Sequence, residues 1–598
     1  MNYKALNNLA TMFFDIAEHF PQKPFLWAKR NGKYISGSYS ETKNKVQLLA
    51  DSLHQLGVEK GDRVVVVSEN RPEWVIADLA IISLGGITVP AYTTNTTDDH
   101  LYILDHSEAK IAIVSVDKLA VRLMNAMSKS ASCKTIISIE ELSSDVDPSL
   151  KHLDWSSLLA PRDKLTTDVL KEAINLKRDD IACFIYTSGT GGNPKGVMLT
   201  HGSILANCSS AYDLLTEFGL GDEIFLSLLP LSHSYEHTCG LYFPISIGAQ
   251  IYYAEGPDKV AQNLQEAKPT IMTAVPRLYE ALHDRIQRGV QQSGGLKKYL
   301  FDLTLELGRK ERVGKKPLSL TEKLSNMLVD HAVRTKVSQR FGGRLKAFVS
   351  GGAALNPDIG NFFLSLGVNI LQGYGQTEAS PIISCNRPGN IRIETVGPAL
   401  KDVEIKIAED GEILVRGELV MKGYWKDPVA TRAAIKDGWL HTGDVGVLEQ
   451  DGSLRITDRK KDIIVISGGD NIAPARVEGA ITREPEFLQA MVYGDKKPYL
   501  VGVVVPSEEF VKEWCEGQKD TFTLGELSDN AEFNSVIQSV MTRINSRLSQ
   551  IEKVRHVIVA EEPFTTENGL MTPTLKIKRH KILENYSEKL ERLYRRSQ

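Results

Sequence analysis

The sequence predicts an α/β protein with a large N-terminal domain of parallel-rich sheets flanked by helices. A small β-rich subdomain completes that domain, and a small C-terminal α/β domain follows. Short apolar runs alternate with helical patterns in the first half of the chain, which favours parallel strands joined by helices. From Glu404 the pattern changes to short strands and turns. At 598 residues the chain is also too long for a single hydrophobic core.

The composition is that of an ordinary globular protein, with 42% hydrophobic and 24% charged residues. A net charge of −4 gives no indication of a nucleic-acid partner. The six cysteines form no C-x-x-C pair, which argues against a zinc site or a disulfide framework and fits a reducing cytoplasm. The first residues contain no apolar signal core. The most apolar stretch, residues 74–92, contains Asp78 and Pro90, so we expect a buried helix–strand pair there rather than a membrane span.

Regular elements are expected from the N-terminus onward. Residues 9–60 predict amphipathic helices around a hairpin, whereas residues 140–180 are polar and poorly periodic, as in a connection. Between these stretches, apolar runs and helical spacing alternate. We expect strands within residues 61–68, 87–90 and 109–114, and helices at residues 72–84 and 98–106.

A glycine-rich string follows a predicted buried strand at residues 181–186 and is followed by a predicted helix at residues 200–215. Its small residues let backbone N–H groups approach an anion, its hydroxyls add donors, and its lysine adds positive charge. The spacing differs from the Walker motif because Gly196 follows the lysine. A plain glycine-rich turn between strand and helix is the alternative. The string predicts a triphosphate-binding loop made of Thr187, Ser188, Gly189, Thr190, Gly191, Gly192 and Lys195.

Other predicted strands also end in polar or glycine-rich loops. The strand within residues 225–233 runs into His233, with Glu236 and His237 close behind; histidines at such a position are either structural or catalytic. The strand at residues 345–350 ends in a glycine turn. Open α/β sheets bind ligands at the carboxyl ends of their strands, so these loops are candidate site elements.

The string at residues 369–380 combines two useful groups. Tyr374 stands between two glycines, so its ring can lie flat on a purine. Glu378 stands beside the hydroxyl of Thr377, and such a carboxylate can hold Mg²⁺ against phosphate oxygens. In the β-rich subdomain, Asp444 follows a predicted strand, where it can accept the hydroxyls of a ribose. A turn aspartate is the plainer interpretation of that residue.

A dense cluster of charges at residues 455–464 indicates a domain boundary. We expect an N-terminal domain at residues 1–457, with the β-rich subdomain at about residues 400–457, and a C-terminal domain at residues 458–598. Strands of the C-terminal domain are expected at residues 489–493, 500–505 and 554–559.

The stretch at residues 284–340 is unusually basic, with thirteen Lys and Arg against six Asp and Glu. Helical patterns run through it, so a solvated helical insertion is one interpretation. Contact with an anionic membrane surface is the other.

Several of these strings resemble the adenylate-forming superfamily, which includes acyl-CoA synthetases, luciferases and peptide-synthetase adenylation domains. The matching strings occur in the family's order and approximate spacing, at residues 187–196, 372–378, 442–444 and 458–461. Those at residues 350–355, 373–378 and 572–576 look like the long-chain fatty acyl-CoA synthetase branch. The chain departs from the usual strings at Gly191, where relatives carry Thr, and at Leu575, where many carry Gly.

The resemblance implies a reaction in two halves. A fatty carboxylate attacks the α-phosphate of ATP to give an acyl-adenylate and pyrophosphate, and the thiol of CoA then displaces AMP. It implies Lys576 as the catalytic lysine, with Lys578 as the competing assignment, and Lys195 on the β- and γ-phosphates. Mg²⁺ would be held by Glu378 with help from Thr187.

The same resemblance implies the remaining roles. His233 would flank the acyl carboxylate, and His237 stands at roughly the place of a tryptophan that gates the acyl tunnel in some long-chain enzymes. Lys461 would be a hinge that swings the C-terminal domain between the half-reactions. The CoA channel would be lined by Ser467, Gly468 and Gly469. Besides the phosphate loop, ATP or AMP would be bound by Gly352, Ala353, Gln372, Gly373, Tyr374, Gly375, Thr377, Asp444, Ile456 and Arg459.

Three alternatives to a fatty acyl-CoA synthetase remain open. The first is a fatty acyl-AMP ligase that delivers its acyl group to a carrier protein; the others are a non-catalytic nucleotide sensor and a peptide-synthetase adenylation domain. The implied partners are ATP, a fatty acid and CoA. The sequence leaves open a homodimer and a peripheral position at the inner face of a membrane.

Overall fold

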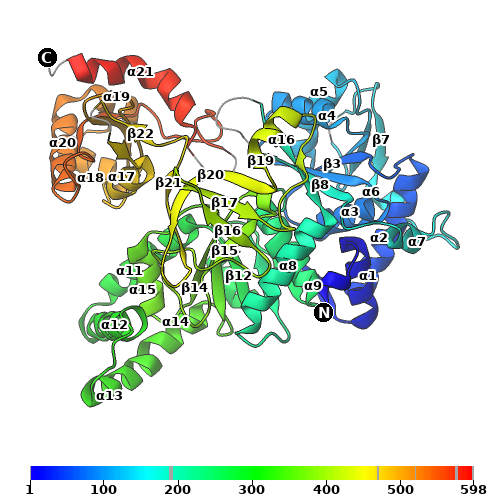
Figure 1. The fold of residues 1–598 in the computed structure, drawn as a ribbon, viewed down its shortest axis with the longest axis horizontal. Coiled ribbons are helices and arrows are strands. Elements are labelled where there is room, and N and C mark those ends of the chain that lie inside the picture. The colour runs from blue at the N-terminus through cyan, green and yellow to red at the C-terminus, as the bar shows by residue number, and fades with distance from the viewer. Residues whose placement is uncertain are drawn as a thin grey trace.

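Two eight-stranded sheets form the body of the N-terminal domain in the computed structural model (Figure 1). The structure describes residues 2–143, 145–187, 193–467, 470–518, 520–572 and 577–595. The first sheet has the order β15-β14-β13-β12-β10-β11-β1-β2. Its strands are β1 (Pro24–Arg30), β2 (Lys33–Ser38), β10 (Ile224–Ser227), β11 (Gln250–Tyr253), β12 (Ile271–Ala274), β13 (Ala347–Ser350), β14 (Ile370–Gly375) and β15 (Ile382–Cys385).

The second sheet has the order β18-β9-β8-β4-β3-β5-β6-β7. Its strands β3 to β7 are parallel neighbours, with β4 also parallel to β8. Strand β3 is buried throughout its valines, as expected when helices cover both faces of a parallel sheet. The strands are β3 (Arg63–Val67), β4 (Ile87–Ala91), β5 (Ile111–Val114), β6 (Thr135–Ser138), β7 (Lys151–Asp154), β8 (Ile181–Thr187), β9 (Lys195–Thr200) and β18 (Gly423–Tyr424).

Helices cover these sheets. The predicted helix–strand pair at residues 74–92 is confirmed: Trp74 to Ser83 are buried in α3, and β4 is buried as well. In the described part of the chain, no helix is both long and apolar enough to cross a membrane. The covering helices are α1 (Leu9–His19), α2 (Tyr39–Gln55), α3 (Pro72–Ser83), α4 (Thr97–Ser107), α5 (Asp117–Lys129), α6 (Trp155–Leu158), α7 (Val169–Ile174), α8 (His201–Thr216), α9 (Phe243–Ser246), α10 (Val260–Ala267) and α15 (Pro357–Ser365).

The sequence suggests that the glycine-rich string connects a strand to a helix. In the structure, a further strand lies between the string and that helix. Residues Lys195–Thr200 form a strand, β9, that pairs antiparallel with β8, and helix α8 begins only after it. Thr200 caps α8 by accepting from the N–H of Ser203. The string therefore closes a hairpin. The expected connection at residues 140–180 also contains regular elements, namely β7, α6 and α7.

The β-rich subdomain is a five-stranded sheet of order β16-β17-β20-β19, with β21 paired to β20. The C-terminal domain has its own hydrophobic core and a three-stranded sheet of order β24-β25-β26. The subdomain contains β16 (Glu404–Ile407), β17 (Glu412–Arg416), α16 (Pro428–Ala434), β19 (Ile435–Lys436), β20 (Trp439–Leu448) and β21 (Leu454–Arg459). The C-terminal domain contains β22 (Ile464–Val465), β23 (Asn471–Ile472), α17 (Pro474–Ile481), β24 (Phe487–Tyr493), β25 (Leu500–Pro506), α18 (Glu508–Gln518), α19 (Leu524–Asp529), α20 (Ala531–Asn545), β26 (Val554–Val559) and α21 (Arg579–Arg595).

The basic insertion is helical, as predicted, and projects from one end of the molecule (Figure 1). Gly308, at the end of its second helix, packs so closely that an added Cβ would overlap the backbone of Ser365 in α15. The insertion is therefore held against the N-terminal domain by direct helix contact. Its elements are α11 (Pro276–Ser293), α12 (Gly295–Gly308), α13 (Leu320–Val329) and α14 (Thr335–Arg340), with π-helical turns η3 (Arg309–Val313) and η4 (Asp330–Arg334).

A pair of glycine substitutions tests this packing. Gly308→Ala should lower the midpoint of thermal unfolding, because its methyl group meets the Ser365 backbone and such overpacking costs about 1–3 kcal/mol. Gly289→Ala in exposed α11 should raise it slightly, because no atom lies within 4 Å and alanine is the better helix former by roughly 0.5–1 kcal/mol. Equal shifts for both variants would contradict the close contact.

Candidate active site

The carboxyl ends of four parallel strands meet at one edge of the first sheet. Strands β10, β12, β13 and β14 are parallel neighbours, so the loops that follow them lie side by side. The hydroxyl of Tyr235, after β10, donates to the carbonyl of Val349 in β13 over 2.8 Å. The hydroxyls of Ser234 and Thr377 are 2.9 Å apart and link the loops after β10 and β14. This edge thus brings together the loop that contains His233 and the loop that contains Glu378, the predicted Mg²⁺ ligand.

Helix α8 fixes the turn that carries Glu378. The amide of Asn207 in α8 donates to the carbonyl of Ala379 over 3.1 Å and accepts from the N–H of Ile382 over 2.7 Å. Gly375 is required just before the turn, because a Cβ there would overlap the carbonyl of Pro381. The direction of the Glu378 side chain is therefore set by backbone contacts on both sides.

Tyr424 joins Glu378 to Lys195. Its hydroxyl donates to Oε1 of Glu378 over 2.9 Å, and Nζ of Lys195 lies 4.7 Å from the centre of its ring. Burial, and next the Glu378 carboxylate, raise the pKa of Tyr424 well above its usual range. Strand β18 brings this tyrosine in by pairing with the edge of β9. The sequence analysis missed Tyr424, because nothing near it in the chain points to a role.

Asp444 is held from two sides. Its Oδ2 accepts from the hydroxyl of Tyr374 over 2.7 Å, and its Oδ1 accepts from Nε of Arg459 over 2.9 Å. The hydroxyl of Thr442 supports the backbone by accepting from the N–H of Asp444. Burial, and next the Asp444 carboxylate, raise the pKa of Tyr374 well above its usual range. Three residues predicted to bind nucleotide therefore form one polar cluster.

The predicted phosphate loop is described only at its stem. Thr187 and Lys195 are paired at the end of the β8–β9 hairpin next to this loop. Beside the stem, the hydroxyl of Tyr186 lies 2.8 Å from Nδ1 of His106, and burial lowers the pKa of that histidine. The hydroxyl of Tyr102 donates to the carbonyl of Pro194 over 3.0 Å. The predicted residues Ser188, Gly189, Thr190, Gly191 and Gly192 lie outside the described residues.

Three polar residues follow β10, namely His233, Glu236 and His237, and their surroundings differ. Nδ1 of His233 accepts from the N–H of Tyr235 over 3.2 Å, so the neutral ring carries its proton on Nε2. Glu236 is fully buried in the π-helix η2 (Glu236–Tyr242), where the hydroxyls of Ser227 and Thr273 both donate to it over 2.6 Å. Burial raises the pKa of Glu236 to about 7.

His237 belongs to the core. It is 1% exposed, and its Nε2 lies 3.2 Å from the fully buried carboxylate of Asp78 in α3. The hydroxyl of Tyr242 donates to the same carboxylate over 2.5 Å, and Trp74 packs edge-on against the imidazole. His237 thus lies in a buried polar cluster with an ion-pair geometry.

Other predicted residues are distributed around this edge. Gly352 has a φ of +82°, which favours glycine, and it follows β13 beside the exposed Ala353. Gln372 is buried in β14, next to Gly373, and accepts from the N–H of Leu355 over 3.2 Å. Ile456 is half-buried in β21.

The predicted hinge and CoA-channel residues are described in part. Lys461 and Ser467 are exposed and follow β21 and β22. Gly468, Gly469 and Lys576 lie outside the described residues. The competing Lys578 is described, and its N–H donates to the carbonyl of Leu570.

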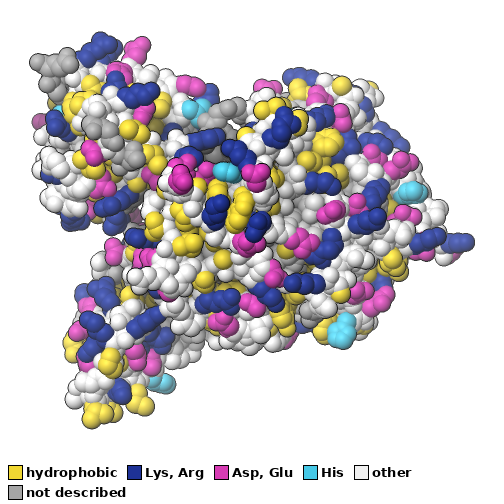
Figure 2. All heavy atoms as spheres, in the orientation of Figure 1, with side chains coloured by type: hydrophobic (Ala, Val, Ile, Leu, Met, Phe, Trp, Pro, Cys, Tyr) yellow, Lys and Arg dark blue, Asp and Glu magenta, His cyan; other side chains and the backbone are white. Residues whose placement is uncertain are grey.

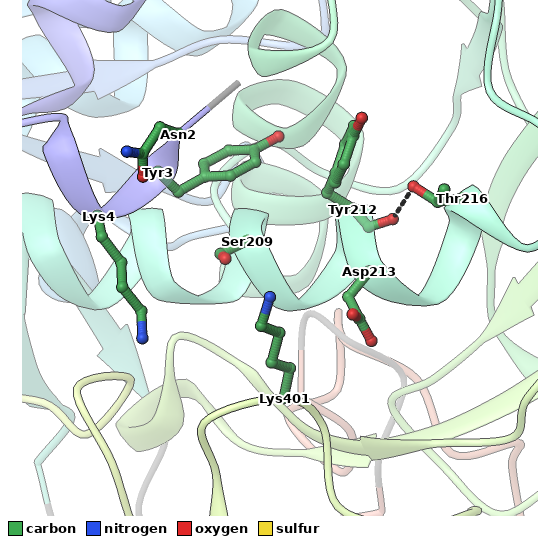
Figure 3. Close-up of a pocket in the computed structure, with 8 residues that line it drawn as sticks. All are labelled: Asn2, Tyr3, Lys4, Ser209, Tyr212, Asp213, Thr216 and Lys401. Atoms are coloured by element: carbon green, nitrogen blue, oxygen red, sulfur yellow. Dashed lines mark hydrogen bonds between the residues drawn. The ribbon is translucent and has the colours of Figure 1, made fainter.

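A surface hollow of about 290 Å³ lies between the N-terminus and α8 (Figure 3). The rings of Tyr3 and Tyr212 approach there with centroids 5.8 Å apart. Among the described residues, none that lines this hollow belongs to the predicted site. Its lining residues are Asn2, Tyr3, Lys4, Ser209, Tyr212, Asp213, Thr216 and Lys401.

Comparison with known families decides the identity of the fold. The sequence pattern of the AMP-binding enzyme family matches residues 13–425, and that of the AMP-binding enzyme C-terminal domain matches residues 461–598. The chain belongs to the AMP-binding enzyme family. Both segments match in the order that the sequence strings indicate.

Curated relatives of this AMP-binding enzyme match it over nearly its whole length. A long-chain-fatty-acid–CoA ligase of Mycobacterium tuberculosis is 29% identical over 98% of this chain and 97% of its own. The peroxisomal long chain acyl-CoA synthetase 6 of Arabidopsis thaliana is 32% identical over 94% of this chain and 82% of its own.

Solved structures share the fold of this AMP-binding enzyme. An anthranilate CoA ligase in complex with anthranoyl-AMP superposes with a TM-score of 0.73 at 21% identity, covering 98% of this chain and 99% of that one. A benzoate CoA ligase from Burkholderia xenovorans gives a TM-score of 0.69 at 23% identity, covering 96% and 100%. The predicted α/β architecture is confirmed.

The buried carboxyl of Glu236 predicts a pH dependence of stability. Its pKa is about 7 in the folded state and 4.5 ordinarily, so the folded chain binds the extra proton between these values. Stability should therefore fall as pH rises from about 4.5 to about 7, by an amount on the order of 3 kcal/mol. Glu236→Gln should remove this fall. The check is the unfolding midpoint of both proteins across that pH range; parallel curves would exclude the buried neutral carboxyl.

Proposed function

We propose that this AMP-binding enzyme is a long-chain fatty acid–CoA ligase that forms AMP. It joins a fatty acid to CoA through an acyl-adenylate and releases pyrophosphate. The observation that supports this most is that the two curated relatives above, which match 94% or more of the chain, are named for long-chain acyl-CoA formation. The clustering of ATP-directed residues at one sheet edge agrees with this chemistry.

The first half-reaction must overcome repulsion between a carboxylate and the triphosphate. Lys195 would supply a cation at the stem of the proposed phosphate loop, and backbone N–H groups of the loop would add donors. His233 lies in the loop after β10, on the side proposed for the acyl carboxylate.

Glu378 fits the role of a Mg²⁺ ligand. Its carboxylate offers hard oxygen donors, is half-buried, and has only Oε1 engaged by Tyr424 in the hydrogen bonds identified for it. In the described part of the chain, no three His, Cys, Asp or Glu side chains form a ready metal cluster. Mg²⁺ characteristically needs only one or two carboxylates plus substrate phosphates, and when bound it neutralises charge on those phosphates. Thr187 is the second proposed ligand.

The nucleotide would be oriented by the Asp444 cluster. Asp444 and Arg459 would bind the ribose hydroxyls, and Tyr374 would stack on adenine. An ionised carboxylate has about four acceptor sites, so Asp444 can keep its bonds to Tyr374 and Arg459 while it accepts from ribose.

The second half-reaction would follow rotation of the C-terminal domain about Lys461. That rotation removes Lys576 and brings residues 467–469 to the pantetheine channel. An ion pair between Arg288 of α11 and Glu509 of α18 links the domains over 3.2 Å. Its side chains are 63% and 82% exposed, so breaking it costs little. Such a weak contact suits a domain that has to move.

CoA is the proposed acceptor, since the relatives described above are named for it rather than for a carrier protein. The proposed location is the cytoplasm. All six cysteines are buried and unpaired, as in proteins kept in a reducing compartment.

A substitution tests whether Tyr424 positions the proposed Mg²⁺ ligand. Tyr424→Phe removes the hydroxyl bond to Glu378, and we expect roughly tenfold slower pyrophosphate release, as for loss of one bond to a charged group. Raising Mg²⁺ should recover part of this loss. Tyr34→Phe, which removes a hydroxyl bond to Tyr253 far from the site, is the control. An unchanged Mg²⁺ dependence would show that Tyr424 plays no positioning role.

The main test measures pyrophosphate and AMP release with ATP, Mg²⁺ and fatty acids of increasing length, with and without CoA. Lys576→Ala should slow adenylation by roughly 10²–10³-fold, as when a group that stabilises the transition state is lost. It should still convert pre-made acyl-adenylate and CoA to acyl-CoA. Lys578→Ala is the matched control and should leave both half-reactions intact.

Other outcomes of this test have clear meanings. If Lys578→Ala rather than Lys576→Ala abolishes adenylation, the competing assignment holds. Accumulation of acyl-adenylate with no effect of CoA would support the carrier-linked ligase. Turnover with no chain length would overturn the proposed substrate class.

A further inference from the structure

Helix α13 of the insertion turns its apolar side to solvent. Its inward side is mostly polar: Glu322 accepts from Lys310 over 2.7 Å, and Asn326 accepts from Arg334 over 2.7 Å. The buried residue of α13 is Val329. The outward positions recur at helical spacing and form one apolar stripe. The stripe consists of Leu320, Leu324, Met327 and Leu328, which are 81%, 65%, 71% and 70% exposed.

Exposed apolar side chains concentrate in this insertion. In the described part of the chain, eight large hydrophobic side chains are at least 63% exposed, and six of them lie between residues 296 and 328. Scattered surface hydrophobics are normal, but a gathered set marks an interaction surface. Figure 2 shows hydrophobic and cationic side chains together at the end of the molecule where Figure 1 labels α13. Leu296 and Tyr299 of α12 complete the set of six.

The insertion presents this stripe in a fixed orientation. Leu307, Leu318 and Val329 form a small core between α12 and α13. Nε of Arg334 donates to the carbonyl of Ser365 over 3.1 Å, which ties the insertion to α15. These contacts hold the inward side of α13 against the rest of the insertion, and its apolar stripe therefore faces solvent.

Cations border the stripe. Lys323 lies three residues after Leu320 and four before Met327, so it flanks the apolar positions on the same helix. Lys297 and Lys316 are also exposed. Across residues 284–340, thirteen cationic side chains face six anionic ones. A short apolar stripe bordered by lysines is the pattern of a helix that lies in the interface of an anionic bilayer.

We propose that α13 docks this enzyme on an anionic lipid bilayer. The helix lies in the plane of the interface, its stripe enters the boundary between headgroups and acyl chains, and the surrounding lysines contact anionic headgroups. This inference does not depend on the proposed ligase activity, because it rests on the surface of the insertion alone.

The test is flotation of the full-length protein, without substrate, on vesicles of phosphatidylcholine and phosphatidylglycerol in a roughly 2:1 ratio. The variant L324Q/M327Q/L328Q should lower the partition coefficient at least about tenfold, because it removes most of the buried apolar area. The matched control, I174Q/V429Q, changes two side chains that are 65% and 68% exposed elsewhere, and it should bind like wild type.

Charge provides an independent measurement. Neutralising Lys297, Lys316 and Lys323 with glutamine should weaken binding by about fivefold for each charge. Pure phosphatidylcholine or high salt should have a similar effect on wild type. All variants should keep the thermal unfolding midpoint of wild type, since the changed side chains are exposed.

Two results would overturn the proposal. One is vesicle binding by L324Q/M327Q/L328Q equal to that of wild type. The other is a wild-type dimer in solution that this variant converts to monomer, with no vesicle binding by either protein. The stripe would then be an interface between two copies of the chain.

Discussion

The carboxylate of Asp444 connects three parts of the chain. Tyr374 comes from the large sheet, Asp444 from the β-rich subdomain, and Arg459 from the strand that leads into the C-terminal domain. A carboxylate that is 6% exposed is costly unless it is paired and hydrogen-bonded. The two donors meet this requirement only while all three parts keep their places. Whatever binds at Asp444 is therefore coupled to the position of the segment next to the proposed hinge.

Tyr424 is a second residue that contacts two parts of the site, and it separates two opposite charges. Lys195 and Glu378 have opposite charges and opposite tasks, since one would attract phosphate and the other would hold a cation against it. Direct pairing would neutralise both. Tyr424 stands between them, with its ring near the ammonium and its hydroxyl on the carboxylate. A neutral aromatic spacer of this kind interacts with the cation through its ring face and leaves both charges available to a ligand.

Elements that depend on local sequence patterns were predictable, whereas those that depend on contacts between residues distant in the chain were not. Buried strands such as β3 were predictable, because a parallel sheet covered on both faces requires continuous apolar residues. Strand β9 was not, because its short segment becomes a strand through pairing with β8 across the glycine-rich string. Tyr424 was missed for a similar reason, since its partners are distant in sequence. The insertion was predicted as helical and basic, but an amphipathic pattern ordinarily predicts a buried apolar face. The contacts of Glu322 and Asn326 with the insertion's own cations, which join residues of different elements, turn the apolar side of α13 outward.

His237 shows how packing decides between two roles that a sequence position allows. A gating side chain must swing between two positions of similar energy. His237 instead pairs with the buried Asp78, which also binds the hydroxyl of Tyr242. Moving the imidazole away would leave the buried carboxyl group of Asp78 with one partner fewer, and leaving a buried polar group without its partner typically costs about 1–3 kcal/mol. The geometry therefore assigns His237 to the framework that holds η2 against α3, and η2 in turn follows directly on the loop that presents His233 at the sheet edge.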